Sequence, residues 1–192
     1  MSEKLSFRIQ GVSPLVMHNG QLADPSNSYS RAMKEISGKR AKTEADYEEM
    51  ARLEWMGSLY LLKGEPCIPG YVLEATLIGR GGAARKQKMG RQAAAGLYVT
   101  ADFPLEYEGP RDPKELWPVE DFRFQVLVRV QQSRVMRTRP IFQEWAASVW
   151  FEVEPDLVNT ADAKLWMEIA GRESGLMDWR PKFGRFQVLD GN

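Results

Sequence analysis

Residues 65–96 read EPCIPGYVLEATLIGRGGAARKQKMGRQAAAG, and the rest of the chain can be interpreted outward from this stretch. The dipeptide Pro69-Gly70 is typical of a turn, and Leu73 and Leu77 then recur at helical spacing. A glycine follows at the point where such a helix would end. The sequence therefore predicts a turn that leads into a short helix over residues 70–79.

A basic segment follows this helix over residues 79–96. It holds five cations, several glycines and no acid. The cations are Arg80, Arg85, Lys86, Lys88 and Arg91. Because like charges repel and the segment lacks the apolar residues to pack, we expect a loop that closes on a polyanion. A solvated surface loop is the alternative that these residues leave open.

Length and composition bound the architecture. The chain has 192 residues, of which 43% are hydrophobic, and it contains six tryptophans. A chain of this size can bury one sizeable core. We therefore expect a single domain over residues 1–192 with insertions at about residues 20–60 and 131–142.

Charge is balanced overall but unevenly distributed along the chain. The 26 Lys and Arg residues equal the 26 Asp and Glu residues, and a sequence pI of about 6.6 argues against a uniformly basic nucleic-acid binder. Acids concentrate in residues 44–54 and 102–121, whereas cations concentrate in residues 79–96, 123–139 and 172–185. Such segregation predicts a basic groove with an acidic back, or head-to-tail stacking of copies.

Several classes of site are excluded by residue usage. One Cys and one His rule out a disulfide framework and a Cys/His zinc site. The sequence contains no phosphate-binding loop, nucleophile elbow or dinucleotide fingerprint, so we predict no cofactor and no bound metal. Neither a signal region nor a run of roughly 20 apolar residues occurs. We therefore expect a cytoplasmic protein without a membrane partner.

Hydrophobic periodicity predicts the order of the elements. Alternation predicts strands, and helical spacing predicts helices, the last of them capped by Thr160. In chain order they are strand 5–16, helix 70–79, strands 97–107, 122–130 and 146–153, helix 160–170 and strand 184–189. This is the order of a ferredoxin-like unit, an α+β fold shared by RNA-recognition domains. We expect an antiparallel sheet backed by two helices, with a helical insertion after the first strand and an arginine-bearing hairpin.

The second insertion, residues 131–142, interleaves three arginines with Val, Met and Phe. These are Arg134, Arg137 and Arg139. Such a hairpin suits a single-stranded nucleic acid, because the cations grip the backbone while the apolar side chains meet the bases. The alternative is a hairpin whose arginines form salt bridges to the acidic segments.

Two segments resemble motifs of the RAMP superfamily, the CRISPR-associated proteins built on RNA-recognition-type folds. Residues 68–77 resemble its I-P-G-S-S-L-K-G-x-L segment, although Glu74 stands where the family prefers lysine or a small residue. Residues 169–172 with residues 184–186 are similar to its glycine-rich loop before the last strand, which residues 178–181 lengthen in this chain. Both segments occur in the family's order.

This resemblance implies a subunit that stacks head to tail along an RNA, and it extends to phage-borne proteins that would coat single-stranded DNA. It assigns nucleic-acid binding to Tyr71, Arg80, the basic segment and the arginine hairpin. Arg172, Arg180 and Arg185 near the C-terminal glycines complete the predicted set. The implied partners are single-stranded RNA or DNA, copies of the chain and other subunits of a nucleoprotein complex, in a bacterial or phage-infected cell.

Three functions stay open. The favoured one is a non-enzymatic single-stranded nucleic-acid-binding protein that coats a strand by head-to-tail assembly. The second is a metal-dependent endoribonuclease centred on Asp24, because superfamily members that cut RNA carry a loop aspartate after the first strand. The third is a self-assembling structural protein whose basic and acidic faces recognise each other.

Overall fold

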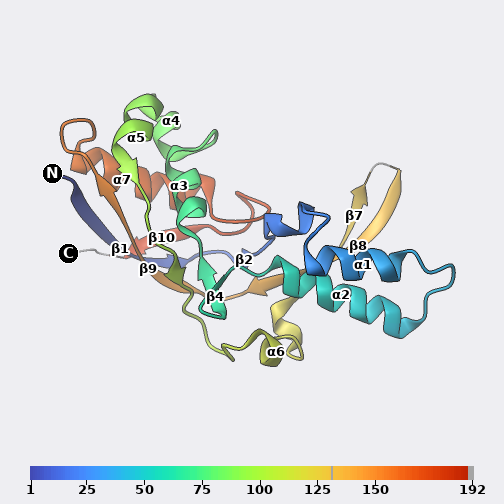
Figure 1. Ribbon diagram of the computed structural model, residues 1–192. Coiled ribbons are helices and arrows are strands. Elements are labelled where there is room, and N and C mark those ends of the chain that lie inside the picture. The colour runs from blue at the N-terminus through green and yellow to red at the C-terminus, as the bar shows by residue number, and fades with distance from the viewer. Residues whose placement is uncertain (131, 190–192) are drawn as a thin grey trace.

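The computed structural model describes residues 1–130 and 132–189 and shows an α+β protein with antiparallel sheets (Figure 1). Its largest sheet has four strands in the order β10-β1-β9-β5, and every neighbouring pair is antiparallel. The strands are β1 (Glu3–Gly11), β5 (Leu97–Tyr98), β9 (Ala146–Val153) and β10 (Phe186–Leu189). Alternate residues of β1 and β9 are buried, as their periodicity predicts.

The two predicted helices are confirmed. They are α3 (Gly70–Ile78) and α7 (Thr160–Ile169), which lie on the same side of the four-stranded sheet in Figure 1. Asn159, rather than Thr160, caps α7, because the Asn159 side chain accepts a hydrogen bond from the N–H of Ala161. Thr160 is the first helical residue. A π-helical turn, Ala170–Ser174, continues α7 toward β10.

The predicted strand 5–16 is interrupted, which corrects our expectation of one continuous strand. It divides into β1 and β2 (Leu15–Val16), and β2 belongs to a different sheet. The break follows from Gly11, where a Cβ would lie 2.2 Å from the Trp145 ring. The Trp145 indole N–H also donates to the carbonyl of Ser13 at 2.9 Å, so the backbone turns away here instead of continuing the ladder.

The predicted strand 97–107 is also wrong as a single element. It consists of β5, β6 (Phe103–Pro104) and an isolated bridge from Glu106 to Ala146. The side chain of Glu74, in α3, accepts a hydrogen bond from the backbone N–H of Val99 at 3.1 Å, between β5 and β6. β6 pairs instead with β4 (Glu65–Ile68), which also pairs with β3 (Leu61–Leu62).

The first insertion is helical, as predicted. It contains a short 3-10 turn (Gly20–Ala23), α1 (Ser28–Ser37) and α2 (Glu44–Ser58). Thr43 caps α2 in a capping box with Asp46, in which each side chain accepts a hydrogen bond from the other residue's backbone N–H. Figure 1 shows α1 and α2 side by side at the end of the molecule away from α4 and α5.

The arginine-bearing hairpin is present, but it is larger than the predicted insertion 131–142. Its strands are β7 (Arg123–Val130) and β8 (Ser133–Phe142), and they form a separate sheet in the order β2-β8-β7. The predicted strand 122–130 therefore joins the hairpin and not the four-stranded sheet. Residue 131 lies outside the described residues. The short helix α6 (Pro113–Leu116) and a 3-10 turn (Glu120–Phe122) precede β7.

The basic segment 79–96 is not an unpacked loop, which corrects a further expectation. It forms α4 (Ala83–Lys86) and α5 (Gly90–Gly96). Ala83, Ala84 and Ala93 are completely buried, because their small side chains allow close packing against the neighbouring elements. Alanine supplied the apolar surface that we expected to be missing.

One connected cluster of buried side chains joins the four-stranded sheet, its helices and the inner end of α2. Trp55 of α2 belongs to this cluster, and its indole N–H donates to the carbonyl of Phe122 at 2.8 Å. Within the described residues, every helix is too short or too polar to cross a bilayer.

Candidate nucleic-acid interface

Two basic segments that lie about ninety residues apart in the sequence meet at the surface. Lys86 lies 3.4 Å from Glu173 of the π-helical turn, and the Ser174 hydroxyl donates to the carbonyl of Gly81 at 3.3 Å. These contacts place the segment that contains α4 and α5 beside the turn that follows α7. Cations from both segments therefore share one surface.

A second set of contacts joins the glycine-rich loop, residues 175–184, to α3. Arg180 Nη1 donates to the Thr76 hydroxyl at 3.2 Å, and this hydroxyl lies 3.1 Å from the carbonyl of Gly175. Thr76 is fully buried, so the contact anchors the loop against the helix. The Pro-Gly helix and the glycine-rich loop, the two segments that carry the family resemblance, are thus neighbours.

The loop needs glycine at its ends. Gly175 and Gly184 have φ angles of 71° and 74°, in the left-handed region that glycine adopts without strain. At Gly184 a Cβ would also lie 2.0 Å from the carbonyl oxygen of Leu176. The N–H of Leu176 in turn donates to the carbonyl of Gly184 at 2.9 Å. This hydrogen bond joins the two ends of the loop and positions the residues between them beside α3.

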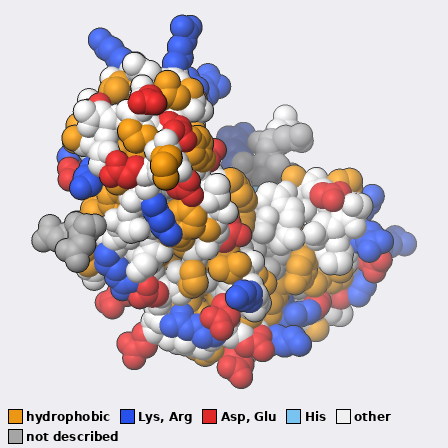
Figure 2. Space-filling model, turned by 60° about the vertical axis from the view of Figure 1, so that its left-hand side comes forward, with side chains coloured by type: hydrophobic (Ala, Val, Ile, Leu, Met, Phe, Trp, Pro, Cys, Tyr) orange, Lys and Arg blue, Asp and Glu red, His pale blue; other side chains and the backbone are white. Residues whose placement is uncertain are grey.

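Most of the predicted cations near this surface are exposed. We call the following set the basic face: Arg80, Arg85, Lys86, Lys88, Arg91, Arg172 and Arg180. Figure 2 shows Lys and Arg side chains projecting from the end of the molecule where α4 and α5 lie. The carboxylate of Glu173 lies beside two of these cations, and its hydrogen bonds from Arg172 and Lys86 lower its pKa. Arg185 is exposed at the start of β10, and its backbone N–H donates to the Ser13 hydroxyl.

Two exposed aromatic side chains come from α3 and from the glycine-rich loop. Tyr71, in the first turn of α3, is 61% exposed and meets Tyr60 edge to face at 6.2 Å. Trp179, next to Arg180, is 38% exposed and packs edge to face on Phe124 at 5.5 Å. Sequence reasoning missed Trp179 as a site residue, although an aromatic residue beside an arginine in a glycine-rich loop was a usable signal.

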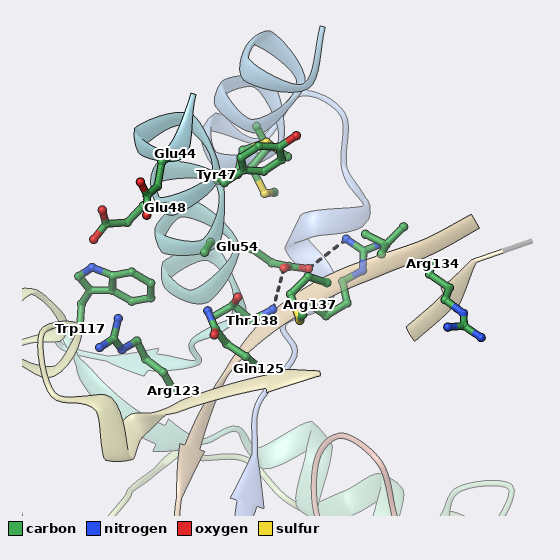
Figure 3. A pocket seen from close by; sticks show the side chains of 15 residues that line it. Glu44, Tyr47, Glu48, Glu54, Trp117, Arg123, Gln125, Arg134, Arg137 and Thr138 are labelled. Carbon is green, nitrogen blue, oxygen red and sulfur yellow. Dashed lines mark hydrogen bonds and ion pairs between the residues drawn. The ribbon is translucent and has the colours of Figure 1, made fainter. Parts of the chain in front are cut away.

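The remaining predicted arginines belong to the hairpin of β7 and β8, which lies away from α4 and α5 (Figure 1). Glu54 of α2 is only 7% exposed and accepts hydrogen bonds from Arg137 at 3.0 Å and from Arg139 at 3.3 Å. Its other oxygen accepts from the backbone N–H of Thr138 at 2.9 Å (Figure 3). Arg139 also lies 3.5 Å from Asp178.

Arg137 and Arg139 therefore follow the alternative in which hairpin arginines pair with an acidic segment. The sequence contained both partners but not their pairing, because Glu54 lies more than eighty residues before them. Arg134 is exposed, and within the described residues it makes no ion pair. Of the three predicted hairpin arginines, Arg134 is thus the one whose charge stays open to a partner.

A groove of about 610 Å³ lies between α2 and the hairpin. Its walls carry both charges, from Glu44 and Glu48 on one side and from Arg123 and Arg134 on the other (Figure 3). Arg123 lies over the Trp117 ring at 5.0 Å. The sequence did not predict this groove, which depends on how the insertion and the hairpin pack.

Asp24 is exposed in the turn before α1. Its carboxylate accepts hydrogen bonds from the N–H and the hydroxyl of Ser26, both at 2.8 Å, and these bonds lower its pKa. Among the described residues, no group of three or more His, Cys, Asp or Glu side chains is placed to hold a metal ion. His18 lies elsewhere, near Arg139, and burial together with that positive charge lowers its pKa.

No protein-family model matches the chain, and no curated protein is significantly similar to it in sequence.

Proposed function

We propose that this protein binds single-stranded nucleic acid through the basic face and coats the strand by head-to-tail assembly, without acting as an enzyme. The observation that carries the proposal is the meeting of two distant basic segments, residues 79–96 and 172–185, on one surface. Clustered cations raise the local concentration of a polyanion and release its counterions on binding. The partly exposed rings of Tyr71 and Trp179 supply stacking surfaces for unpaired bases.

The strand order supports a ferredoxin-like assignment as part of this proposal. Counting only β1, β5, β9 and β10, the first and third strands lie in the middle of the sheet and the second and fourth at its edges. α3 connects the first pair in sequence and α7 connects the second, as in a β-α-β-β-α-β unit. The nearness of the Pro-Gly helix and the glycine-rich loop supports the proposed RAMP relationship.

The charge distribution also limits where a strand would run. The groove beside α2 contains exposed carboxylates, which repel phosphates, whereas Glu173, next to the basic face, is already paired with Arg172 and Lys86. We therefore place the nucleic-acid strand on the basic face. Arg137 and Arg139 instead attach the hairpin to α2. The proposed setting is the cytoplasm of a bacterial or phage-infected cell.

Fluorescence anisotropy with labelled single-stranded DNA and RNA of equal length tests this proposal. Replacing Arg80, Arg172 and Arg180 together with Ala should weaken affinity by about tenfold or more at low salt, since three phosphate contacts are removed. The matched control replaces Arg31, Lys34 and Arg40, exposed cations of the helical insertion, and should change affinity by less than about twofold.

Thermal unfolding of each variant separates binding from stability, because Arg180 also hydrogen-bonds Thr76. Equal losses in the two triple variants would overturn the assignment of the basic face. Absence of binding to both nucleic acids at low salt would overturn the function itself. The ratio of DNA to RNA affinity identifies the natural strand.

A further inference from the structure

The outer edge of β8 is unpaired along the projecting part of the hairpin. Thr138 lies opposite Gln125, and its N–H points away from β7 to Glu54. In an antiparallel ladder the outward-pointing residues alternate, so Met136 and Arg134 also direct their N–H and C=O groups away from β7. Within the described residues, no hydrogen bond reaches these outward groups.

The same register leaves the outer edge of β7 unpaired. Gln125 and Leu127 lie opposite Thr138 and Met136, so their backbone groups also point away from the partner strand. β7 is the terminal strand of its sheet, and no described group hydrogen-bonds these outward positions. One hairpin therefore presents two free edges, each able to accept another strand.

The exposed side chains of the hairpin are apolar in its middle. Leu127 and Met136 are directly opposite each other and are 52% and 56% exposed. Residues 125–128, Gln-Val-Leu-Val, contain neither a charge nor a proline, which are the usual devices that protect an edge strand. Tyr47 of α2, also exposed and lining the adjoining groove, extends the apolar surface.

Charge complementarity identifies the occupant as another copy. Residues 123–139 contain five arginines and no acid, whereas α2 contains five acids and one arginine. Glu54 of the same chain already pairs with Arg137 and Arg139, but Arg134 makes no ion pair within the described residues. Glu44 and Glu48 of α2 line the groove and make no ion pair within the described residues. A second hairpin brings cations to these carboxylates, whereas a nucleic acid in the groove would bring phosphates to them.

We infer that the outer edge of β7 from one copy adds to the outer edge of β8 of the next copy, beside α2, and that this seam joins copies head to tail. The inference deepens the proposed function and rests on its head-to-tail assembly. In a head-to-tail repeat the added β7 runs parallel to the first copy's β7 and hence antiparallel to β8, so the antiparallel ribbon continues.

The two symmetric alternatives are disfavoured. Pairing β8 with β8 would bring the acidic α2 helices of both copies to one seam, where their carboxylates repel. Pairing β7 with β7 would leave the β8 edge and its groove empty. The unlike pairing uses both edges of every hairpin, and as a head-to-tail contact it passes from each copy to the next.

Disulfide trapping between single-cysteine variants distinguishes these arrangements without any nucleic acid. Leu127→Cys protein carrying an affinity tag is mixed with untagged Met136→Cys protein, or with Arg134→Cys protein to cover the neighbouring register, under oxidised glutathione. Native Cys67 does not compete, since it is 1% exposed and burial raises the pKa of its thiol to about 12. We expect a disulfide-linked tagged–untagged dimer in at least one mixture.

The controls make each outcome decisive. A Leu165→Cys variant, 42% exposed on α7, reports random collision when mixed with either partner. A dimer of Met136→Cys alone, or of Leu127→Cys alone, at a yield above the mixture would replace the inferred seam with a symmetric one. A yield no higher than the Leu165→Cys control in both mixtures overturns the inference. If disulfide trapping fails but anisotropy still shows nucleic-acid binding, only the inferred seam is wrong. If trapping succeeds but no nucleic acid binds, only the proposed nucleic-acid binding is wrong.

Discussion

At the scale of single residues, Glu54 decides what the hairpin arginines do. Its carboxylate is almost fully buried and is surrounded by Arg137, Arg139 and the N–H of Thr138. A buried charge of this kind is tolerated because donors from three residues hydrogen-bond its carboxylate. The residue therefore converts two arginines that look like ligand-binding groups into the attachment of β8 to α2.

Replacing Glu54 with Gln should destabilise the protein by about 3 kcal/mol, because Arg139, only 12% exposed at its side chain, loses its main counterion. Urea unfolding followed by tryptophan fluorescence measures the change. Glu49→Gln is the matched control: its pair with Arg52 is partly exposed on both sides and should contribute less than about 1 kcal/mol. Equal destabilisation of the two variants would show that the Glu54 network is not a buried anchor.

At the scale of elements, the local signals of the sequence were strong. The Thr43 cap, the α3 turn at Pro69-Gly70 and the alternating β9 each formed where the pattern predicted. Caps and periodicity act over a few residues, so they are readable without tertiary information. The continuous strands 5–16 and 97–107 failed because Trp145 and Glu74, both distant in sequence, interact where those strands would have continued.

The capping box makes the N-terminus of α2 sensitive to acid. The ion pair with Lys39 and the N–H of Thr43 lower the pKa of Asp46 to about 2, against an ordinary value of 3.8. Because the folded-state pKa is depressed, the stabilisation is complete above about pH 4 and is lost as pH falls toward about 2. Asp46→Asn should therefore lose less stability than the wild type over this window.

Urea unfolding at several pH values between about 4 and 2 measures this difference, and an NMR titration of the Asp46 carboxyl group checks the pKa directly. Glu44→Gln, in the same helical turn but outside the capping box, should keep the wild-type pH dependence. An unchanged pH dependence in Asp46→Asn would show that another carboxylate governs acid sensitivity.

At the scale of the whole molecule, a neutral chain separates its charge between surfaces. Cations from two segments form the basic face at the end made by α4 and α5 (Figure 2), while α2 and the hairpin, at the other end of the molecule in Figure 1, share the mixed-charge groove (Figure 3). Separation of this kind allows one surface to bind a polyanion while another binds a second copy. Net charge alone does not reveal either surface.

The salt dependence of binding should report the basic face. For single strands the logarithm of the affinity falls with the logarithm of salt by about 0.7 for each phosphate contact. Replacing Arg80, Arg172 and Arg180 with Ala should thus reduce the slope by about 2, measured by anisotropy over a range of salt concentrations. A variant that loses affinity but keeps the wild-type slope would show that these arginines act on the fold and not on phosphates.

The sequence by itself determined the helices α2, α3 and α7, the strands β7, β9 and β10, and the positions of the basic segments, because caps, turns and periodicity act locally. Tertiary structure alone decided which sheet each strand joins, that Lys86 and Glu173 bring two basic segments together, and that Glu54 takes Arg137 and Arg139. Whether an arginine faces solvent or a buried carboxylate depends on residues more than eighty positions away, and on the free energy of burying them together.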